Sequence, residues 1–228
     1  LSLCLRQGED RDAWIAQLQS HDREARAGEL SPRAIITSGD PAKLPGYNQA
    51  WLAQEEGAQV LALALGAGPD DVVLDACAGR GGKTLLLVNS GATGDAAHQH
   101  PKKLERLRGA PWGRPVRNTH AVDWTRGVGD VPSGYDRVLV DAPCTGSGTL
   151  RRRPEIALKL AASDPTRMAA LQLEITRRAA TRLRPGGTLV YAVCSVLREE
   201  CEGVVAALLA DDTLGLTEAP FTAGPTVI

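Results

Sequence analysis

Short apolar runs alternate with helical patterns over most of the chain. The runs are DVVLDAC, GATGDAA, VRNTHAVD, DRVLVDAP and GTLVYAVC, and helical stretches follow all of them except VRNTHAVD. Strands that alternate with helices predict an α/β fold with a doubly wound, mostly parallel sheet covered on both faces. Ligands of such sheets bind beyond the carboxyl ends of the strands, so the residues that follow each run are the candidates for function.

The first part of the chain has a different pattern. Residues 1–45 combine a helical stretch, RDAWIAQLQSHDREARAG, with a turn-rich one, LSPRAIITSGDPAKLPG. This mixture predicts a small N-terminal appendage, and residues 46–228 then form the main domain. In the main domain, apolar spacing predicts a helix from Trp51 to Gly66 and a long helical region that ends at Arg184.

Composition narrows the class of protein. The chain has 228 residues with 26 basic and 27 acidic side chains, so no global positive field indicates a nucleic-acid partner and any basic surface must be local. The longest apolar run, VLALALGAG, is shorter than the roughly 20 residues of a membrane span, and no signal-peptide pattern is present. We therefore expect a cytoplasmic protein with no membrane partner. The chain starts without methionine, which allows for a fragment of a longer protein, and the sequence does not exclude a monomer.

The cysteine pattern excludes two further classes. The five cysteines are odd in number and form no C-x-x-C pair, which argues against a disulfide framework and a zinc site. We expect free thiols and no metal at Cys4, Cys77, Cys144, Cys194 and Cys201.

A glycine-rich loop follows the first strand of the main domain. In DVVLDACAGRGGKT, the glycines Gly79, Gly81 and Gly82 let a ligand approach backbone amides at the start of a helix. A phosphate-binding P-loop requires glycine where Cys77 stands, and a dinucleotide site requires glycine where Thr84 stands. A strand–helix turn without a ligand is an alternative, but a nucleoside cofactor without a pyrophosphate fits best.

Polar residues near other strand ends extend this site. Asp123 either accepts a hydrogen bond from an adenine amino group or serves as a turn or helix-cap aspartate. Ribose hydroxyls require a partner at the second strand end, and either Asp95 or His98 supplies it.

Two cysteines follow predicted strands, and they would lie close together if these strands are neighbours in the sheet. Neighbouring strands lie about 4.8 Å apart, so Cys144 and Cys194 could reach a common point. Each alone would more often be a small buried side chain. Together with Asp141, which could be protonated or bond a ring nitrogen, they suggest thiolate addition to C6 of a pyrimidine. This addition makes C5 nucleophilic toward an electrophilic methyl group, and the second cysteine could assist release.

Local positive charge lies in two segments. Arg151, Arg152 and Arg153 directly follow the proposed active-site loop and are the stronger candidates for binding phosphates. RLRGAPWGRPVR adds further arginines. The arginines of the long helical region are equally well explained as a solvated face.

Three motifs together resemble those of one enzyme family. DACAGRGGKT, DAPCTGSGTLRRRPE and LRPGGTLVYAVCSVLREE look like the cofactor motif, the Pro-Cys motif and the Cys-Ser motif of the Sun/Nop family of S-adenosylmethionine-dependent RNA 5-methylcytosine methyltransferases. PGYNQAWLAQEEGAQ resembles the segment that precedes the catalytic domain in this family. The resemblance covers roughly residues 43–205. It implies a Rossmann-like class I methyltransferase fold, with residues 1–45 as the remnant of an RNA-binding subdomain.

The resemblance also implies roles for individual residues. Asp123 would meet the adenine side of the cofactor, and Asp141 would lie between cofactor and target base. Cys194 would be the nucleophile, Cys144 would aid release of the methylated RNA, and Lys83 would help organise the catalytic loop. The S-adenosylmethionine site would be lined by Cys77, Ala78, Gly79, Arg80, Gly81, Gly82 and Lys83, with His98 in the place of the family's ribose-binding acid.

The function expected from these features is cytosine-C5 methylation of RNA, with ribosomal RNA as the first candidate and transfer RNA as the second. Two alternatives remain at this stage. The chain could methylate a small molecule, in which case the two cysteines are incidental. It could also be a non-catalytic RNA-binding or assembly factor whose cofactor site has decayed, an interpretation that rests on Arg80 and His98.

Overall fold

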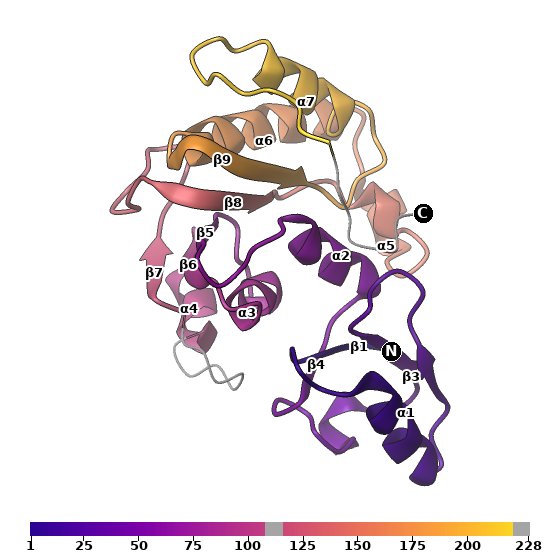
Figure 1. Cartoon of the computed structure of the whole chain (residues 1–228). Helices are drawn as coiled ribbons and strands as arrows, with labels where there is room; N and C mark the ends of the chain where they lie inside the picture. The colour runs from indigo at the N-terminus through magenta and orange to yellow at the C-terminus, as the bar shows by residue number, and fades with distance from the viewer. Residues whose placement is uncertain (108–115, 221–228) are drawn as a thin grey trace.

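The computed structural model describes residues 1–107 and 116–220, which build two sheets (Figure 1). The first is antiparallel, with strand order β2-β3-β1-β4. Asp10 caps helix α1 by accepting hydrogen bonds from the backbone N–H groups of Asp12 and Ala13. The elements of this part are β1 (Ser2–Leu5), α1 (Arg11–Ser20), β2 (Ala25–Ala27), β3 (Ala34–Thr37), the 3₁₀ turn η1 (Pro41–Lys43) and β4 (Trp51–Ala53).

The second sheet is parallel throughout and has the order β7-β6-β5-β8-β9. The predicted doubly wound α/β fold is therefore confirmed. Its strands are β5 (Val72–Asp75), β6 (Thr93–His98), β7 (Asn118–Ala121), β8 (Tyr135–Asp141) and β9 (Leu183–Ala192). Its helices are α2 (Glu56–Ala64), α3 (Gly82–Asn89), α4 (Pro101–Leu104), α5 (Glu155–Lys159), α6 (Asp164–Ala180) and α7 (Glu202–Leu209), with 3₁₀ turns η2 (Glu105–Leu107) and η3 (Ser147–Thr149).

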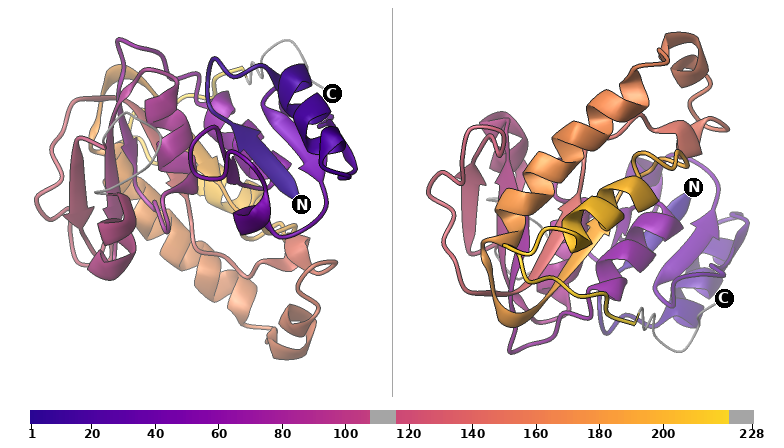
Figure 2. Two further views of the ribbon diagram at one scale, coloured as in Figure 1. Left: turned by 90° about the horizontal axis from the view of Figure 1, so that it is seen from below. Right: turned by 90° about the horizontal axis from the view of Figure 1, so that it is seen from above.

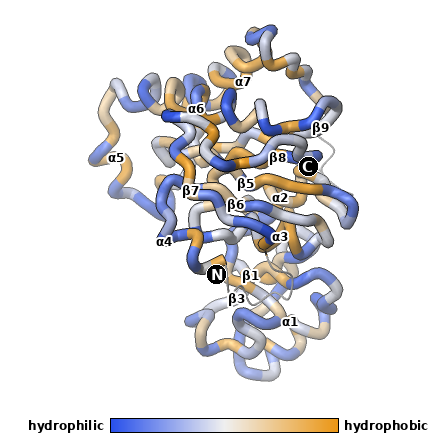
Figure 3. Tube along the Cα trace, turned by 90° about the vertical axis from the view of Figure 1, so that its left-hand side faces the viewer, coloured by the Kyte–Doolittle hydropathy of each residue, from blue (hydrophilic) through white to orange (hydrophobic). Residues whose placement is uncertain are grey.

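Alternate side chains of the central strands enter two separate cores. Val73 and Leu139 pack on the face covered by α2, α3 and α4, whereas Leu74, Val138 and Val140 pack on the face covered by α6. Helix α7 packs against α6 (Figure 2). Strand β5 forms a hydrophobic stretch through the middle of the molecule (Figure 3). Burial on both faces explains why these strands read as continuous apolar runs.

Three local predictions were wrong. Trp51–Ala53 forms strand β4 rather than the start of a helix, because Trp51 pairs with Leu5 and is fully buried. Ala25–Ala27 likewise forms a strand, since it pairs with β3. The long helical region is divided into η3, α5 and α6, and α6 ends at Ala180 instead of Arg184.

The antiparallel sheet packs on the main domain through α2. Gln59 of α2 is buried, donates hydrogen bonds to the carbonyl oxygens of Leu3 and Gln54, and accepts one from the Ser31 hydroxyl. The sheet itself extends to Ala53, and the domain division at residue 45 stays a prediction. In the described part of the chain, no helix combines the length and apolar character that a membrane span needs.

Candidate active site

The carboxyl ends of β8 and β9 bring the two predicted cysteines together. The strands are neighbours, with Asp141 paired to Ala192, and Cys144 and Cys194 follow shortly after these ends. The two Sγ atoms lie 3.1 Å apart. The backbone N–H of Gly148 donates to the carbonyl oxygen of Cys194 at 3.0 Å, which joins the two loops. The common point that the sequence predicted for the thiols therefore exists.

The two thiols differ in pKa, so a negative charge on the pair lies on Cys194. The hydrogen bond from Cys144 lowers the pKa of Cys194, against the opposing effects of burial and of Asp141, and Lys83 assists the lowering. The same hydrogen bond, together with burial, raises the pKa of Cys144. Cys194 is the more exposed of the two, so a charge there retains more solvation. The arrangement supplies a thiolate at Cys194 and a protonated thiol at Cys144.

Lys83 and Asp141 form an ion pair beside the thiols. Lys83 lies in the first turn of α3, directly after the glycine loop, and its Nζ is 2.6 Å from Oδ2 of Asp141 at the end of β8. Both side chains are partly shielded from solvent, with exposed fractions of 17% and 32%. Lys83 donates this hydrogen bond to the Asp141 side chain and so holds it at the end of β8.

The glycine loop has the backbone that its sequence predicted. Gly79 and Gly81 adopt positive φ angles of 57° and 86°, and α3 begins at Gly82. A Cβ on Gly81 would lie 2.0 Å from the Leu107 side chain, so this position requires glycine. Arg80, the residue between these two glycines, is exposed.

Two backbone hydrogen bonds hold the start of the glycine loop against β6 and β8. The Ala78 N–H donates to the carbonyl oxygen of Ala97 in β6, and the Ala76 N–H donates to Leu139 in β8. Cys77 is partly buried here, and burial raises the pKa of its thiol, so it is not an activated nucleophile.

Asp75, which the sequence analysis left out of the site, ends β5 under this loop. Only 1% of its surface is exposed, and burial raises its pKa to about 6 although Thr84 donates a hydrogen bond to Oδ2. Its Oδ1 has no hydrogen-bond partner within residues 1–107 and 116–220. Its position as the acid that ends a buried strand was the signal that could have identified it.

His98 and Asp95 lie at different depths in β6. His98 is the last residue of the strand, and its buried Nε2 also lacks a partner among the described residues. Burial, followed by the charge of Lys103, lowers its pKa, so the ring is neutral at pH 7. Asp95 is fully buried in mid-strand and accepts hydrogen bonds from Arg117 and Tyr135. Of the two ribose-binding candidates, His98 is therefore the one at the carboxyl end of its strand, where ligands of such sheets bind.

Asp123 follows β7 and forms a local turn. Its Oδ1 accepts hydrogen bonds from the backbone and hydroxyl of Thr125 at 3.0 and 2.7 Å, and these bonds lower its pKa. Asp123 therefore makes the contacts of a turn aspartate, which was one of its two predicted roles. Its contact with adenine stays a prediction.

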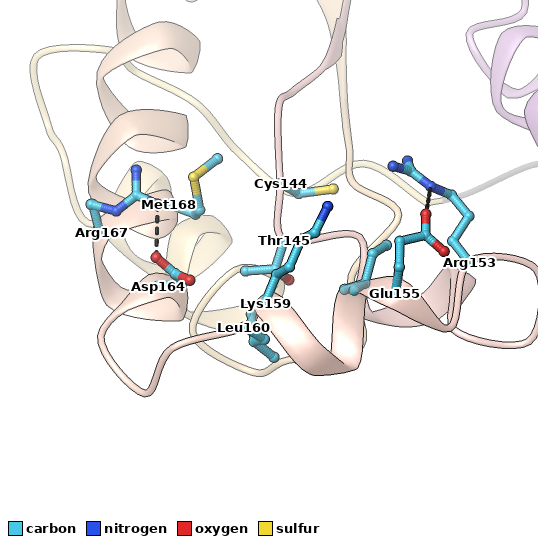
Figure 4. A pocket seen from close by; sticks show the side chains of 10 residues that line it. Cys144, Thr145, Arg153, Glu155, Lys159, Leu160, Asp164, Arg167 and Met168 are labelled. Carbon is cyan, nitrogen blue, oxygen red and sulfur yellow. Dashed lines mark hydrogen bonds and ion pairs between the residues drawn. The ribbon is translucent and has the colours of Figure 1, made fainter.

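The side chains of the three consecutive arginines have different neighbours. Arg153 lines a cavity of about 270 Å³ that also contains Cys144, Lys159 and Arg167. Figure 4 shows the Lys159 side chain reaching from α5 toward Cys144. Arg152 instead forms an ion pair with Glu55, and Arg151 is exposed. Of the three arginines, Arg153 is thus the one that lines the same cavity as Cys144.

The second basic segment is described only in part. Arg108 and Arg114 lie outside the described residues, and Arg117 forms an ion pair with the buried Asp95. Arg117 therefore belongs to a structural ion pair in the core of the sheet. Within residues 1–107 and 116–220, no cluster of three or more histidine, cysteine or acidic side chains could hold a metal ion.

Comparison with known proteins assigns the family. The family described as 16S rRNA methyltransferase RsmB/F matches residues 62–224. The chain belongs to this family. Membership agrees with the predicted Sun/Nop resemblance and with the positions of the glycine loop and both cysteines inside the matched region.

Individual relatives agree with the assignment to RsmB/F. A ribosomal RNA small subunit methyltransferase B from Enterobacter sp. (strain 638) is 35% identical over 228 residues, covering 94% of this chain and 52% of that protein. The protein of the same name from Thermus thermophilus is 42% identical over 149 residues, covering 64% of this chain and 36% of that protein. The chain thus spans about half or less of the length of these relatives.

Solved structures support the fold. The crystal structure of PH0851 matches with a TM-score of 0.83 and 27% identity, covering 92% of this chain and 49% of that chain. The crystal structure of NSun6 from Pyrococcus horikoshii with SFG matches with a TM-score of 0.77 and 17% identity, covering 91% of this chain and 79% of that chain. At that identity the second match shows the fold alone.

Proposed function

We propose that this chain is the catalytic part of an S-adenosylmethionine-dependent methyltransferase that modifies C5 of cytosine in ribosomal RNA. The observation that supports this most directly is the pair of thiols 3.1 Å apart, in which one is activated and the other protonated. The names of the relatives, ribosomal RNA small subunit methyltransferases, support ribosomal RNA as the substrate.

The cofactor fits the residues at the strand ends. The positive-φ glycines open the backbone for close approach, and two buried polar atoms, Asp75 Oδ1 and His98 Nε2, are available for hydrogen bonds. The glycine loop, His98, Asp123 and Asp141 would hold it. When bound, S-adenosylmethionine supplies an electrophilic methyl group that an activated C5 accepts.

Cys194 starts the chemistry. Its thiolate attacks C6 of cytosine and forms a carbon–sulfur bond, and the electron pair of the C5–C6 double bond becomes available at C5 for the methyl group. Asp141 can accept a hydrogen bond from the exocyclic amino group of the base, which orients the ring. Lys83 holds Asp141 in place through the ion pair.

Cys144 completes the reaction in this proposal. Once the Cys194 sulfur is bonded to carbon, its negative charge is gone, and the cause that most raises the pKa of Cys144 is removed. Cys144 can then release its proton to solvent and take the proton from C5. The carbon–sulfur bond breaks, Cys194 leaves as a thiolate, and the thiol pair returns to its starting state with one proton released.

The test is a denaturing gel of Cys144→Ala incubated with ribosomal RNA and S-adenosylmethionine, beside Cys194→Ala and the double variant. A covalent protein–RNA band is expected for Cys144→Ala alone, because the adduct forms but cannot be released. If a folded Cys144→Ala that binds the cofactor gives no band, the proposal is wrong for this chain. Normal turnover by Cys194→Ala would support a small-molecule methyltransferase instead.

A further inference from the structure

A buried carboxylate connects the loops that bear the two thiols. Glu200 lies just before α7, and its side chain is fully buried. Its Oε2 accepts hydrogen bonds from the backbone N–H of Thr145 at 2.9 Å and from Nε2 of Gln172 at 2.8 Å. Its Oε1 accepts hydrogen bonds from the Ser195 hydroxyl at 2.7 Å and from the Thr145 hydroxyl. One side chain is therefore bound by donors from three separate segments.

Two of the three donor residues stand next to the cysteines in sequence. Thr145 directly follows Cys144, and Ser195 directly follows Cys194. Gln172 of α6 also donates to the carbonyl oxygen of Pro143, the residue before Cys144, at 3.0 Å. The carboxylate thus fixes both loops at the positions adjoining their thiols, from the side of α6 and α7.

Glu200 stays ionised in this setting. Burial alone would raise its pKa, but the hydrogen bonds from Thr145 and Ser195 outweigh burial and hold the pKa below its usual value. A buried charge persists only where its hydrogen-bonding capacity is met, and here all four donors point at it. Removing the carboxylate would leave these donors without their acceptor. It would loosen the two loops at the residues next to the thiols, although the hydrogen bonds of Gly148 to Cys194 and of Ser147 to Ser195 would still join them.

We propose that Glu200 is a positioning residue that sets the separation of the Cys144 and Cys194 thiols. The catalytic consequence rests on the proposed function, whereas the geometric consequence does not. Glu200 acts through Thr145 and Ser195, because its hydrogen bonds go to the neighbours of the thiols. A displacement of about 1 Å in a reacting group can cost about 100-fold in rate, so a loop clamp of this kind affects turnover more than substrate binding.

Three variants separate positioning from charge. Glu200→Ala removes all four bonds. Glu200→Gln keeps the shape, and the Thr145 and Ser195 hydroxyls can rotate to accept from its amide NH₂, so most of the network persists. Glu199→Gln is the matched control, because Glu199 is the exposed neighbour with the same charge.

The test measures thiol proximity without RNA or cofactor. Diamide oxidises the pair: the two thiols lose their hydrogens to the N=N bond, which becomes a hydrazine, and a sulfur–sulfur bond forms. Peptide mapping by mass spectrometry follows the rate of the Cys144–Cys194 disulfide, and circular dichroism confirms that each variant is folded. We expect the rate to fall about tenfold or more in Glu200→Ala, to stay within about threefold of wild type in Glu200→Gln, and to be unchanged in Glu199→Gln.

A wild-type oxidation rate in folded Glu200→Ala would overturn the proposal. If Glu200→Ala does not fold, Ser195→Ala removes the link from Glu200 to the Cys194 loop, together with the contact between the Ser195 and Ser147 hydroxyls. An unchanged rate in that variant would overturn the proposal equally. Where the RNA reaction can be followed, kcat should fall with little change in KM, with recovery in Glu200→Gln. Slow oxidation in Glu200→Ala together with a failed RNA-adduct test would keep the positioning role and reject the proposed reaction.

Discussion

Lys83 and Asp141 form a 2.6 Å ion pair that joins the first turn of α3 to the last residue of β8. The glycine loop and the strand that leads to Cys144 are thereby fixed relative to each other. The same lysine charge lowers the pKa of Cys194, so the helix that follows the glycine loop and the proposed nucleophile are electrostatically linked.

Replacing Lys83 should therefore make Cys194 less reactive at neutral pH. Lys83→Met removes the positive charge and leaves Asp141, which raises the pKa of Cys194, without its partner. The pH at which Cys194 is half alkylated by iodoacetamide should shift upward, as followed by peptide mapping. Lys83→Arg keeps the charge and should shift it less. An unchanged profile for Lys83→Met would show that the ion pair does not activate the thiol.

Removing Cys144 should shift the same profile further. The hydrogen bond from Cys144 is the largest cause of the lowered pKa of Cys194, so Cys144→Ala should move it toward the ordinary thiol value of about 8.5. Because the thiolate predominates only above its pKa, the reactivity of Cys194 should fall at neutral pH and recover in alkaline solution. The covalent RNA band of Cys144→Ala should accordingly form faster at about pH 8.5 than at about pH 7. Equal alkylation profiles in Cys144→Ala and wild type would contradict this.

The ionised carboxylate of the buried Asp75 should lower the stability of the folded protein at neutral pH. Its folded-state pKa of about 6 lies above the value of 3.8 for an ordinary aspartate, so the fold favours the protonated form. The contribution of Asp75 to stability is then most favourable below about pH 4, falls as the pH rises to about 6, and stays reduced above that, by up to about 3 kcal/mol. Asp75→Asn should remove this pH dependence and raise the free energy of unfolding at pH 7, as measured by urea denaturation.

The same substitution should weaken cofactor binding if Oδ1 is a ligand atom, which calorimetric titration with S-adenosylmethionine would measure. A less stable Asp75→Asn protein at pH 7 would show that the buried carboxylate contributes favourably, contrary to this account.

The sequence predicted the parallel sheet because burial on both faces leaves continuous apolar runs, as in β5 and β8. It also located both thiols, since residues at the ends of adjacent strands share an edge. It mispredicted Trp51–Ala53, whose apolar residues fit a helix and whose strand conformation depends on pairing with β1. The burial of Glu200 was equally hidden: its partners Thr145 and Gln172 are distant in sequence, and REE resembles an exposed charged turn. The hydroxyl after each cysteine was the available signal.

His98 should contribute to cofactor affinity. Its neutral ring presents a buried Nε2 without a partner among the described residues, at the end of β6 beside the glycine loop. Losing one hydrogen bond of about 1 kcal/mol in His98→Ala should weaken S-adenosylmethionine binding roughly five- to tenfold in calorimetry. His21→Ala, at an exposed histidine that follows α1, should bind as wild type does. Absence of binding by the wild-type protein would instead support a decayed cofactor site.

Gly81 should be the least replaceable glycine of the loop. Its φ of 86° disfavours any side chain, and a Cβ would lie 2.0 Å from Leu107, which is itself buried. Gly81→Ala should lower the free energy of unfolding by about 1–3 kcal/mol, through backbone strain and displacement of Leu107. Gly82→Ala is the matched control: Gly82 begins α3, and its nearest neighbour, Gln54, would be 3.5 Å from the new Cβ. Thermal denaturation of both variants would measure the difference in stability. An equal loss of stability in each would mean that the positive φ of Gly81 is not the determining feature.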